Sequence, residues 1–309
     1  MRWEGKKVLI TGINGFIGLN LAKVLLRKNC NIIGIDNFSY VKPDKELKEL
    51  SKNIEIIKAD VSQKSSWEKL PSDIDFIFHF GAPSSVILFK KTPEKCFYET
   101  IWGMYHMLNF AKEYGIIKVV YPSSGSVYAG NKLPHSEQKY PKPLNLYASA
   151  KIACESLAST FQKYVKSTGL RIFAGYGPGE EKKGNFASVV CLFIRDIMND
   201  KKPIVFGDGN QARDFIYIDD VINAIIKAAE VDYCGIINVG TGVATSFNKL
   251  IELINNILGK SIQPVYVPKE KGYVETLQAD ITLMKKLLEI NPIPLEEGLK
   301  HFIEYLVGI

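Results

Sequence analysis

The chain has 309 residues, 46% of them hydrophobic and 23% charged, which is the composition of a folded globular protein and excludes general disorder. It holds no apolar run of the roughly 18 residues that a membrane-spanning helix needs. Residues 1–7 lead too soon into a strand-like run to form a secretory signal, so we expect a cytoplasmic protein with no membrane partner.

The net charge is +6, from 39 Lys and Arg against 33 Asp and Glu. Only five of the basic residues are Arg, and the lysines are scattered among acids, so we expect no nucleic-acid partner. The five cysteines are far apart, and no two have the spacing of a metal or redox site. We therefore expect reduced cysteines that serve packing, and no metal ion.

Short apolar runs predict buried strands, and apolar residues at helical spacing predict helices between them. The expected strands are 7–11, 31–36, 54–59, 74–80, 116–123 and 170–174, and the expected helices are 16–27, 93–114 and 146–168. Strands that alternate with helices and are apolar on both faces indicate an α/β fold with a doubly wound parallel sheet.

The alternation stops near Tyr176, and shorter segments follow. We predict a sheet domain over residues 1–175, to which residues 213–242 return, with 236–239 as a further strand. The smaller lobe is predicted over residues 176–212 and 243–309. Doubly wound sheets bind ligands beyond the carboxyl ends of their strands, so we expect the lobe at that edge.

Three glycines lie where the first strand meets the first helix: Gly12, Gly15 and Gly18, in TGINGFIG. Gly12 permits a tight turn, Gly15 lets the backbone approach a pyrophosphate, and Gly18 lets the helix pack closely on the strand. A strand before the turn and a helix after it favour dinucleotide binding over an ordinary Gly-rich turn.

One carboxylate ends the second expected strand, and another follows the third. Asp36 stands where a carboxylate accepts the adenosine ribose hydroxyls, and it would repel a 2′-phosphate, which favours NAD over NADP. For Asp60 two interpretations stay open, a bond to adenine or a helix N-cap.

A Tyr and a Lys four residues apart share one face of a helix, and the Lys charge can then make the phenol a general base. Three such pairs occur: Tyr114/Lys118, Tyr128/Lys132 and Tyr147/Lys151. Only the last pair opens a long predicted helix, so only there do we expect that geometry. Ser123, Ser124 and Ser126 end the fifth strand, and one hydroxyl could bond both a sugar hydroxyl and the Tyr oxygen.

At these residues the chain resembles the extended short-chain dehydrogenases/reductases, specifically the nucleotide-sugar epimerase/dehydratase family. The matching segments are TGINGFIG (11–18), ID (35–36), HFGA (79–82), SSGSVY (123–128), YASAK (147–151), YGPG (176–179) and FGDGNQARDFIYIDD (206–220). The resemblance implies a Rossmann domain that holds NAD, a nucleotide diphosphate sugar in the C-terminal lobe, and a homodimer.

On this resemblance Ser124, Tyr147 and Lys151 are the expected catalytic residues. The expected NAD-binding residues are Gly12, Asn14, Gly15, Phe16, Ile17, Gly18, Asp36, Asn37, Asp60, Val61, Phe80, Gly81, Ala82, Ser123, Tyr147, Lys151 and Phe173. The expected substrate-binding residues are Ser84, Ser124, Ser126, Asn185, Ser188, Arg213 and Lys271, with Arg213 on the diphosphate.

The residues after Ser124 bear on the reaction. Similar 4,6-dehydratases carry an Asp-Glu pair there, and similar decarboxylases a Glu at the second position, whereas this chain has Gly125 and Ser126. The extra acid/base pair of 3,5-epimerases is also missing, since Cys154 lies in the helix beyond Lys151. What remains is 4-epimerisation, which needs only removal and return of a hydride.

Two positions and one region depart from the family pattern. Ala174 and Thr100 stand where Asn is usual, and Lys269, Lys271 and Thr276 occupy a region that often holds Arg. The segment 182–188 resembles heptose 6-epimerases, but their second acid/base residue would fall at Ala174.

We therefore predict an NAD-dependent nucleotide-sugar 4-epimerase, most simply for a UDP-hexose. The alternatives are a 4-dehydrogenase or 4-ketoreductase, a heptose-type epimerase, and a non-catalytic NAD-binding regulator.

Overall fold

The structure of the protein is a computed structural model that describes residues 2–269 and 273–308. The chain divides into two compact units. Unit 1 comprises Met1–Ser124, Asn145–Arg171 and Ile222–Ile237, and unit 2 comprises Gly125–Leu144, Ile172–Val221 and Asn238–Ile309.

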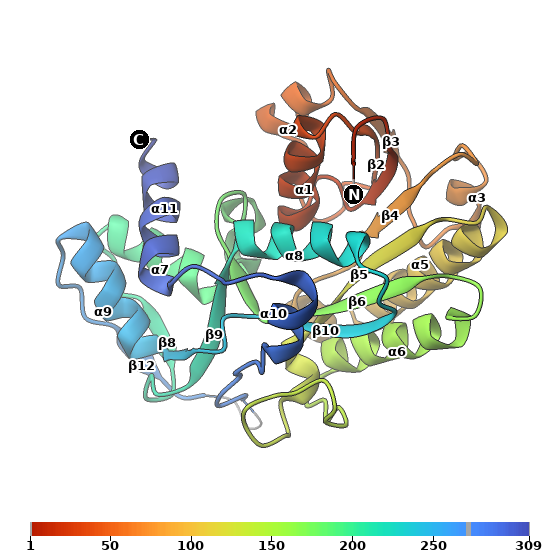
Figure 1. The fold of residues 1–309 in the computed structure, drawn as a ribbon. Helices are drawn as coiled ribbons and strands as arrows, with labels where there is room; N and C mark the ends of the chain where they lie inside the picture. The colour runs from red at the N-terminus through yellow and green to blue at the C-terminus, as the bar shows by residue number, and fades with distance from the viewer. Residues whose placement is uncertain (1, 270–272, 309) are drawn as a thin grey trace. The chain divides into compact units, whose positions relative to one another are not determined.

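A seven-stranded sheet with the order β10-β6-β5-β4-β1-β2-β3 organises unit 1 (Figure 1). Its strands are β1 (Lys7–Thr11), β2 (Asn31–Asp36), β3 (Glu55–Lys58), β4 (Phe76–His79), β5 (Lys118–Ser124), β6 (Ser167–Ile172) and β10 (Gly235–Val239). β1 pairs in parallel with β2 and β4, β2 with β3, and β4 with β5. This order, with its reversal beside β1, is that of a doubly wound dinucleotide-binding fold, which confirms the predicted fold class and the return of residues 236–239 to the sheet.

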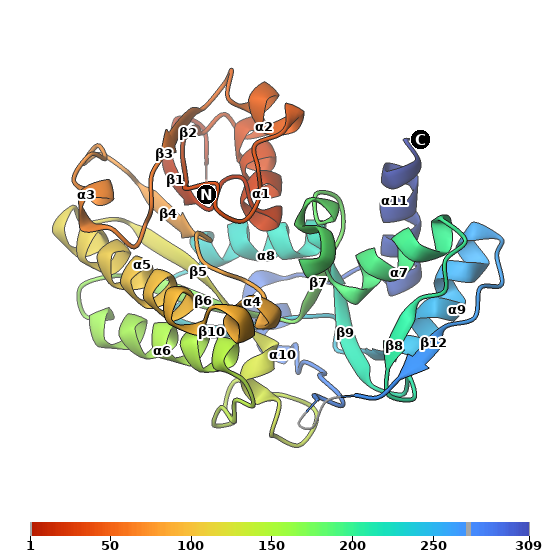
Figure 2. The same ribbon diagram turned by 180° about the vertical axis from the view of Figure 1, so that it is seen from behind.

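Helices cover both faces of this sheet. They are α1 (Phe16–Arg27), α2 (Lys45–Leu50), α3 (Lys64–Trp67), α4 (Val86–Lys91), α5 (Pro93–Glu113), α6 (Leu146–Phe161) and α8 (Ile218–Glu230), the last of which begins in unit 2. Figures 1 and 2 show α5 and α6 side by side on the face opposite α1. On the α5 face, Leu9, Ile77 and Val119 from the strands pack with Met104 and Leu108 from α5.

The first three predicted elements have the predicted bounds, but several later ones do not. The helix expected over 146–168 ends at Phe161, and residues 167–172 form a strand instead of 170–174. All six residues of β6 are buried, so pairing and burial inside the sheet outweigh the helical pattern of the preceding segment. The strands expected over 54–59, 74–80 and 116–123 are observed as Glu55–Lys58, Phe76–His79 and Lys118–Ser124.

Unit 2 contains two small sheets, β11-β9-β7 and β12-β8. The strands are β7 (Ala174–Tyr176), β8 (Ile204–Phe206), β9 (Ala212–Tyr217), β11 (Ala244–Ser246) and β12 (Val265–Val267), and the helices are α7 (Val189–Met198), α9 (Phe247–Leu258), α10 (Thr282–Leu288) and α11 (Leu295–Val307). β9 pairs in parallel with β7 and antiparallel with β11. These short strands of mixed direction agree with the sequence pattern, in which the regular alternation of strands and helices stops near Tyr176.

Among residues 2–269 and 273–308, no helix is long and apolar enough to cross a bilayer. The cytoplasmic location stays a prediction. All five cysteines are free, and four of them are buried, which agrees with a packing role.

Candidate active site

The turn between β1 and α1 has no room for side chains at two of its glycines. The φ of Gly12 is 70°, and a Cβ there would lie 2.6 Å from the carbonyl oxygen of Phe80. A Cβ on Gly18 would lie 2.1 Å from the carbonyl oxygen of Gly12. Gly15 precedes α1 without a side-chain cap. The turn therefore presents backbone at the amino end of a helix, where phosphate groups bind favourably.

Asn14 fixes this turn to the segment that follows β2. Its backbone N–H donates to Oδ2 of Asp36 at 3.1 Å, and its Nδ2 donates to the carbonyl oxygen of Val41 at 2.8 Å. Its Oδ1 is buried and has no hydrogen-bond partner in the described part of the chain. Phe16 is buried and Ile17 is half-buried in the first turn of α1.

Asp36 ends β2 with its carboxylate turned back to the backbone. Oδ2 accepts from Asn14, and Oδ1 accepts from the N–H of Phe38 at 2.7 Å. Burial raises the pKa of Asp36, while these two N–H groups act to lower it. Each carboxylate oxygen can accept a second donor, so a ribose hydroxyl could bind without displacing either bond.

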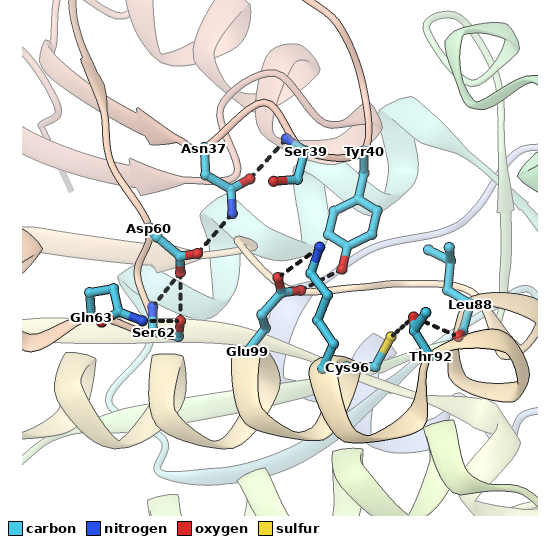
Figure 3. A network of polar contacts seen from close by, with 11 residues as sticks. Asn37, Ser39, Tyr40, Asp60, Ser62, Gln63, Leu88, Thr92, Cys96 and Glu99 are labelled. Atoms are coloured by element: carbon cyan, nitrogen blue, oxygen red, sulfur yellow. Dashed lines mark hydrogen bonds and ion pairs between the residues drawn. The ribbon is translucent and has the colours of Figure 1, made fainter.

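Asp60 lies beside the loop that follows β2 (Figure 3). It accepts hydrogen bonds from the N–H and hydroxyl of Ser62 at 2.9 and 2.7 Å, and from Nδ2 of Asn37 at 3.1 Å. Burial raises its pKa, but the bonds from Ser62 and Asn37 and the charge of Lys95 lower it, and the lowering prevails. The alternative of a helix N-cap is wrong, because Gln63 occupies that position of α3.

Thr11 connects the ends of β1 and β4. The hydroxyl of Thr11 accepts from the N–H of Gly81 at 2.9 Å and lies 2.9 Å from Nδ1 of His79. The N–H of Ala82 donates to the carbonyl oxygen of Phe80 at 3.0 Å. The segment after β4 is therefore held against the glycine turn, whereas Ser84 beyond it is exposed.

The helix α5 passes close to the same place. A Cβ on Gly103 would lie 3.2 Å from the Val61 side chain and 3.7 Å from the His79 ring. Thr100, one turn earlier, is buried, and its Oγ1 has no hydrogen-bond partner among the described residues. Thr100 Oγ1 is thus a second buried polar atom, besides Asn14 Oδ1, that is able to bond with a ligand or a water molecule.

Tyr147 and Lys151 share one face of α6, as the spacing predicts. The helix begins after Asn145, whose Oδ1 accepts from the N–H of Ala148 at 2.9 Å. Nζ of Lys151 lies 5.6 Å from the centroid of the Tyr147 ring, and that ring packs at 71° against Phe89 with 5.6 Å between centroids. The phenol is therefore held by packing, with a cation above its ring.

Lys151 is only 3% exposed, and no hydrogen bond or ion pair of its ammonium is found within residues 2–269 and 273–308. Burial, followed by the charge of Lys151, lowers the pKa of His79 to about 3. Because His79 contacts Thr11, the Lys151 ammonium acts at the carboxyl ends of β1 and β4, next to the glycine turn.

Of the three serines predicted at the end of β5, Ser123 and Ser124 are buried. The hydroxyl of Ser123 donates to Oε1 of Glu155 on α6 at 2.5 Å. Ser124 is 9% exposed and is the last residue of β5, a strand that packs against α6.

The remaining predicted residues lie in unit 2. Ser126 is half-buried in a short helical turn, and a Cβ on Gly125 would lie 2.8 Å from the Phe173 ring. Phe173 is stacked on the ring of His135 with 6.3 Å between centroids. Asn185 is exposed.

Ser188 has local partners. Its hydroxyl donates to Oε2 of the buried Glu180 at 2.7 Å and accepts from the N–H of Cys191 at the start of α7. These bonds give Ser188 a structural role in addition to any contact with substrate.

Arg213 in β9 is held by backbone carbonyl oxygens and by two aromatic rings. Its guanidinium donates to the carbonyl oxygens of Ala212, Val274 and Glu275 at 2.8, 2.8 and 3.1 Å. It also lies over the rings of Phe247 and Tyr273. No carboxylate pairs with it within the described ranges, so its charge is positioned but not neutralised. Lys271 lies outside the described residues.

Two polar networks of unit 1 were not predicted from the sequence. One joins Tyr40, Lys95 and Glu99 beside Asp60, and the other joins Ser123, Glu155 and Arg171 (Figure 3 shows the first). Their members come from different elements, so no local spacing reveals them.

Comparison with known proteins gives consistent results. Residues 8–240 match the model of the NAD dependent epimerase/dehydratase family. The chain is 32% identical to UDP-glucuronate 4-epimerase of Thermodesulfobacterium geofontis, over 96% of this chain and 95% of that protein.

Two solved structures are similar over nearly the whole chain. UDP-glucose 4-epimerase of Thermotoga maritima with UDP-glucose has 31% identity and a TM-score of 0.92, over 98% of this chain and 99% of that one. UDP-glucuronic acid 4-epimerase of Bacillus cereus, with NAD and a 4-deoxy-4-fluoro sugar nucleotide, has 28% identity and a TM-score of 0.90 over the same shares.

Proposed function

The chain belongs to the NAD-dependent epimerase/dehydratase family, and from that premise we propose that it is an NAD-dependent UDP-sugar 4-epimerase. One observation carries the proposal: the Lys151 ammonium lies 5.6 Å from the Tyr147 ring centroid, without a protein counter-ion in the described chain. Gly125 and Ser126 follow Ser124 and bring no second acid or base, so the site suits a reaction confined to one sugar carbon.

The residues of unit 1 fit NAD. The glycine turn supplies a cradle that a Cβ on Gly12 or Gly18 would fill, and the pyrophosphate would bind there. Asp36 would accept the ribose hydroxyls, and the orphaned oxygens of Asn14 and Thr100 offer further contacts. When bound, NAD supplies a reversible acceptor for the hydride of the sugar carbon.

Tyr147 acts as the general base and acid. Its oxygen takes the proton of the sugar 4-hydroxyl and returns it later, and the Lys151 charge favours the ionised phenol in between. The Ser124 hydroxyl donates to the sugar oxygen as negative charge develops there. Each of these groups serves both directions of the reaction, which is what an epimerase needs.

Arg213 would bind the diphosphate of the substrate. A guanidinium held by three carbonyl oxygens and two aromatic rings is preorganised, and it keeps its charge for a phosphate. The UDP-glucose of the Thermotoga maritima structure and the fluorinated UDP sugar of the Bacillus cereus structure support UDP as the nucleotide.

Each alternative function differs from 4-epimerisation in its product or in the residues that it requires. A 4-dehydrogenase or 4-ketoreductase would release a ketone or an alcohol. A heptose-type epimerase would need an acid/base group at Ala174, whose methyl group cannot serve. A non-catalytic regulator has no use for Ser124, Tyr147 and Lys151 together.

The direct test is proton NMR of the purified protein, without added cofactor, on UDP-, GDP- and dTDP-sugars in deuterated water. We expect a 4-epimer of a UDP-sugar with no deuterium on carbon, because the hydride returns without exchange. Tyr147→Phe should abolish turnover yet keep NAD bound. A released ketone, or turnover by that variant, contradicts the proposal.

The proposal includes a homodimer formed through α5. Tyr98, Trp102 and Tyr105 on this helix are 46%, 44% and 39% exposed, and their rings contact one another. Contiguous exposed aromatic surface of this kind favours a protein partner. Light scattering should report a dimer that Trp102→Asp weakens, and a monomer at micromolar concentration would contradict it.

A further inference from the structure

A third charged residue continues the line of Tyr147 and Lys151 along α6. Glu155 follows Lys151 by four residues, as Lys151 follows Tyr147, so the three side chains succeed one another along one side of the helix. The Lys151 residue is 3% exposed, and the Glu155 side chain is 10% exposed. A buried carboxylate therefore lies one turn from the ammonium that the proposed chemistry needs.

Glu155 is occupied by other partners. Nε and Nη2 of Arg171, from β6, donate to Oε1 and Oε2 at 2.8 and 2.6 Å, and the Arg171 side chain is 5% exposed. The hydroxyl of Ser123 adds a bond of 2.5 Å to Oε1. A two-point pairing of guanidinium and carboxylate is both directional and strong.

The groups around these charges are neutral near pH 7. Burial raises the pKa of Tyr121 on β5 well above its usual value and that of Cys154 on α6 to about 11. The pKa of His79 on β4 is lowered to about 3, mainly by burial. Arg171 is therefore the cation that neutralises Glu155, and no third charge among these groups intervenes between Glu155 and Lys151.

Without Arg171, Glu155 would be a buried, unpaired carboxylate. Such a group is costly, and the cation within reach one turn away is Lys151. An ion pair between Lys151 and Glu155 would draw the ammonium away from the Tyr147 ring. Pairing of Glu155 with Arg171 is favoured over pairing with Lys151, because Arg171 donates to both oxygens of the carboxylate. The Lys151 ammonium then has no carboxylate partner among the described residues.

We propose that Arg171 is a positioning residue, which holds Glu155 and thereby reserves the Lys151 ammonium for Tyr147. The bond from Ser123 extends the same arrangement to β5, where Ser124 follows directly. The effect on turnover rests on the proposed epimerase function, whereas the effect on ionisation of Tyr147 does not.

The test compares Arg171→Gln, Glu155→Gln and the double variant, as purified holoproteins. Carbon-13 tyrosine NMR follows the pH midpoint of Tyr147 ionisation, with the signal assigned by Tyr147→Phe. We expect Arg171→Gln to raise this midpoint by about one unit or more, and each unit lowers the ionised fraction tenfold at pH values below it. kcat for the UDP-sugar should fall in proportion, with KM within about twofold because substrate binding is untouched.

The double variant should recover the wild-type midpoint to within about half a unit, since a neutral amide in place of the Glu155 carboxylate no longer competes for the lysine. Asp232→Asn, which breaks the exposed pair with Lys166, controls for loss of an ion pair as such and should change neither quantity. A double variant with the raised midpoint of Arg171→Gln overturns the proposal, and so does an unmoved midpoint in Arg171→Gln.

Thermal unfolding of each variant separates a structural loss from a positioning loss. If Arg171→Gln does not fold, the double variant alone decides the test. A raised pH midpoint of Tyr147 ionisation in the double variant would mean that the Arg171 charge itself acts on Tyr147, and this overturns the proposal. If no UDP-sugar is turned over by the wild type, the proposed function fails, while the midpoints still test this inference.

Discussion

The hydroxyl of Tyr40 donates a hydrogen bond of 2.5 Å to Oε2 of Glu99, 59 residues further along the chain (Figure 3). Nζ of Lys95 lies 3.7 Å from Oε1 of Glu99 and 5.5 Å from the centroid of the Tyr40 ring. Burial, followed by the Glu99 carboxylate, raises the pKa of Tyr40, so this hydroxyl stays a donor throughout the physiological range. The loop after β2 is thereby attached to α5, close to the bond between Asn37 and Asp60.

Tyr40→Phe should loosen the cofactor without changing the chemical step. The variant keeps the ring and loses one hydrogen bond to a buried carboxylate, which is about 1–2 kcal/mol, or roughly a five- to thirtyfold faster release of NAD. The measurement is NAD retained after gel filtration and dilution. Tyr140→Phe, at a side chain that is 89% exposed, is the control, and equal retention in both variants would contradict the prediction.

Gly18→Ala should destabilise the fold and empty the cofactor site. The new Cβ would lie 2.1 Å from the carbonyl oxygen of Gly12, a backbone atom, so the turn itself must move. We expect a loss of about 1–3 kcal/mol in the free energy of unfolding, measured in urea, together with low NAD content. At Gly175 the nearest atoms to a Cβ are 3.7 Å away, so Gly175→Ala should retain both NAD and stability.

Stability should fall as the solution is acidified, in part through His79. Its pKa is about 3 in the folded state against about 6.5 when unfolded, so the unfolded chain binds the extra proton between these values. The contribution of the neutral His79 to the free energy of unfolding is complete above pH 6.5. It is lost as the pH falls toward 3, at up to roughly 1.4 kcal/mol per pH unit. Urea unfolding at several pH values should show a shallower dependence for His79→Gln, and parallel curves would contradict the assignment.

Arg213→Met should weaken substrate binding and spare the cofactor. Loss of a charge-assisted contact to a diphosphate is worth about 1.5–3 kcal/mol, which raises KM for the UDP-sugar by roughly ten- to a hundredfold. NAD content should not change, because the predicted NAD residues other than Phe173 lie in unit 1. Arg195→Met, at a side chain that is 48% exposed beside Asp196, should leave KM unchanged, and a similar rise in both variants would contradict the role of Arg213.

The sequence by itself determined the features that depend on neighbours within about one helical turn or one strand. The glycine turn, the strand that ends at Asp36 and the pairing of Tyr147 with Lys151 follow from local periodicity and spacing. The end of α6 at Phe161 did not follow, because Ser167–Ile172 is drawn into the sheet by strands distant in sequence.

Only the tertiary structure decided which polar side chains have partners. Glu155 and Arg171 come from α6 and β6, and Tyr40 and Glu99 come from a loop and α5, so no spacing predicts either pair. Burial likewise depends on the whole packed core, and it is burial that shields the Lys151 ammonium from water and keeps His79 neutral. The residues proposed to carry the chemistry can therefore be predicted from the sequence. The ion pairs, hydrogen bonds and burial around them are set by the tertiary fold.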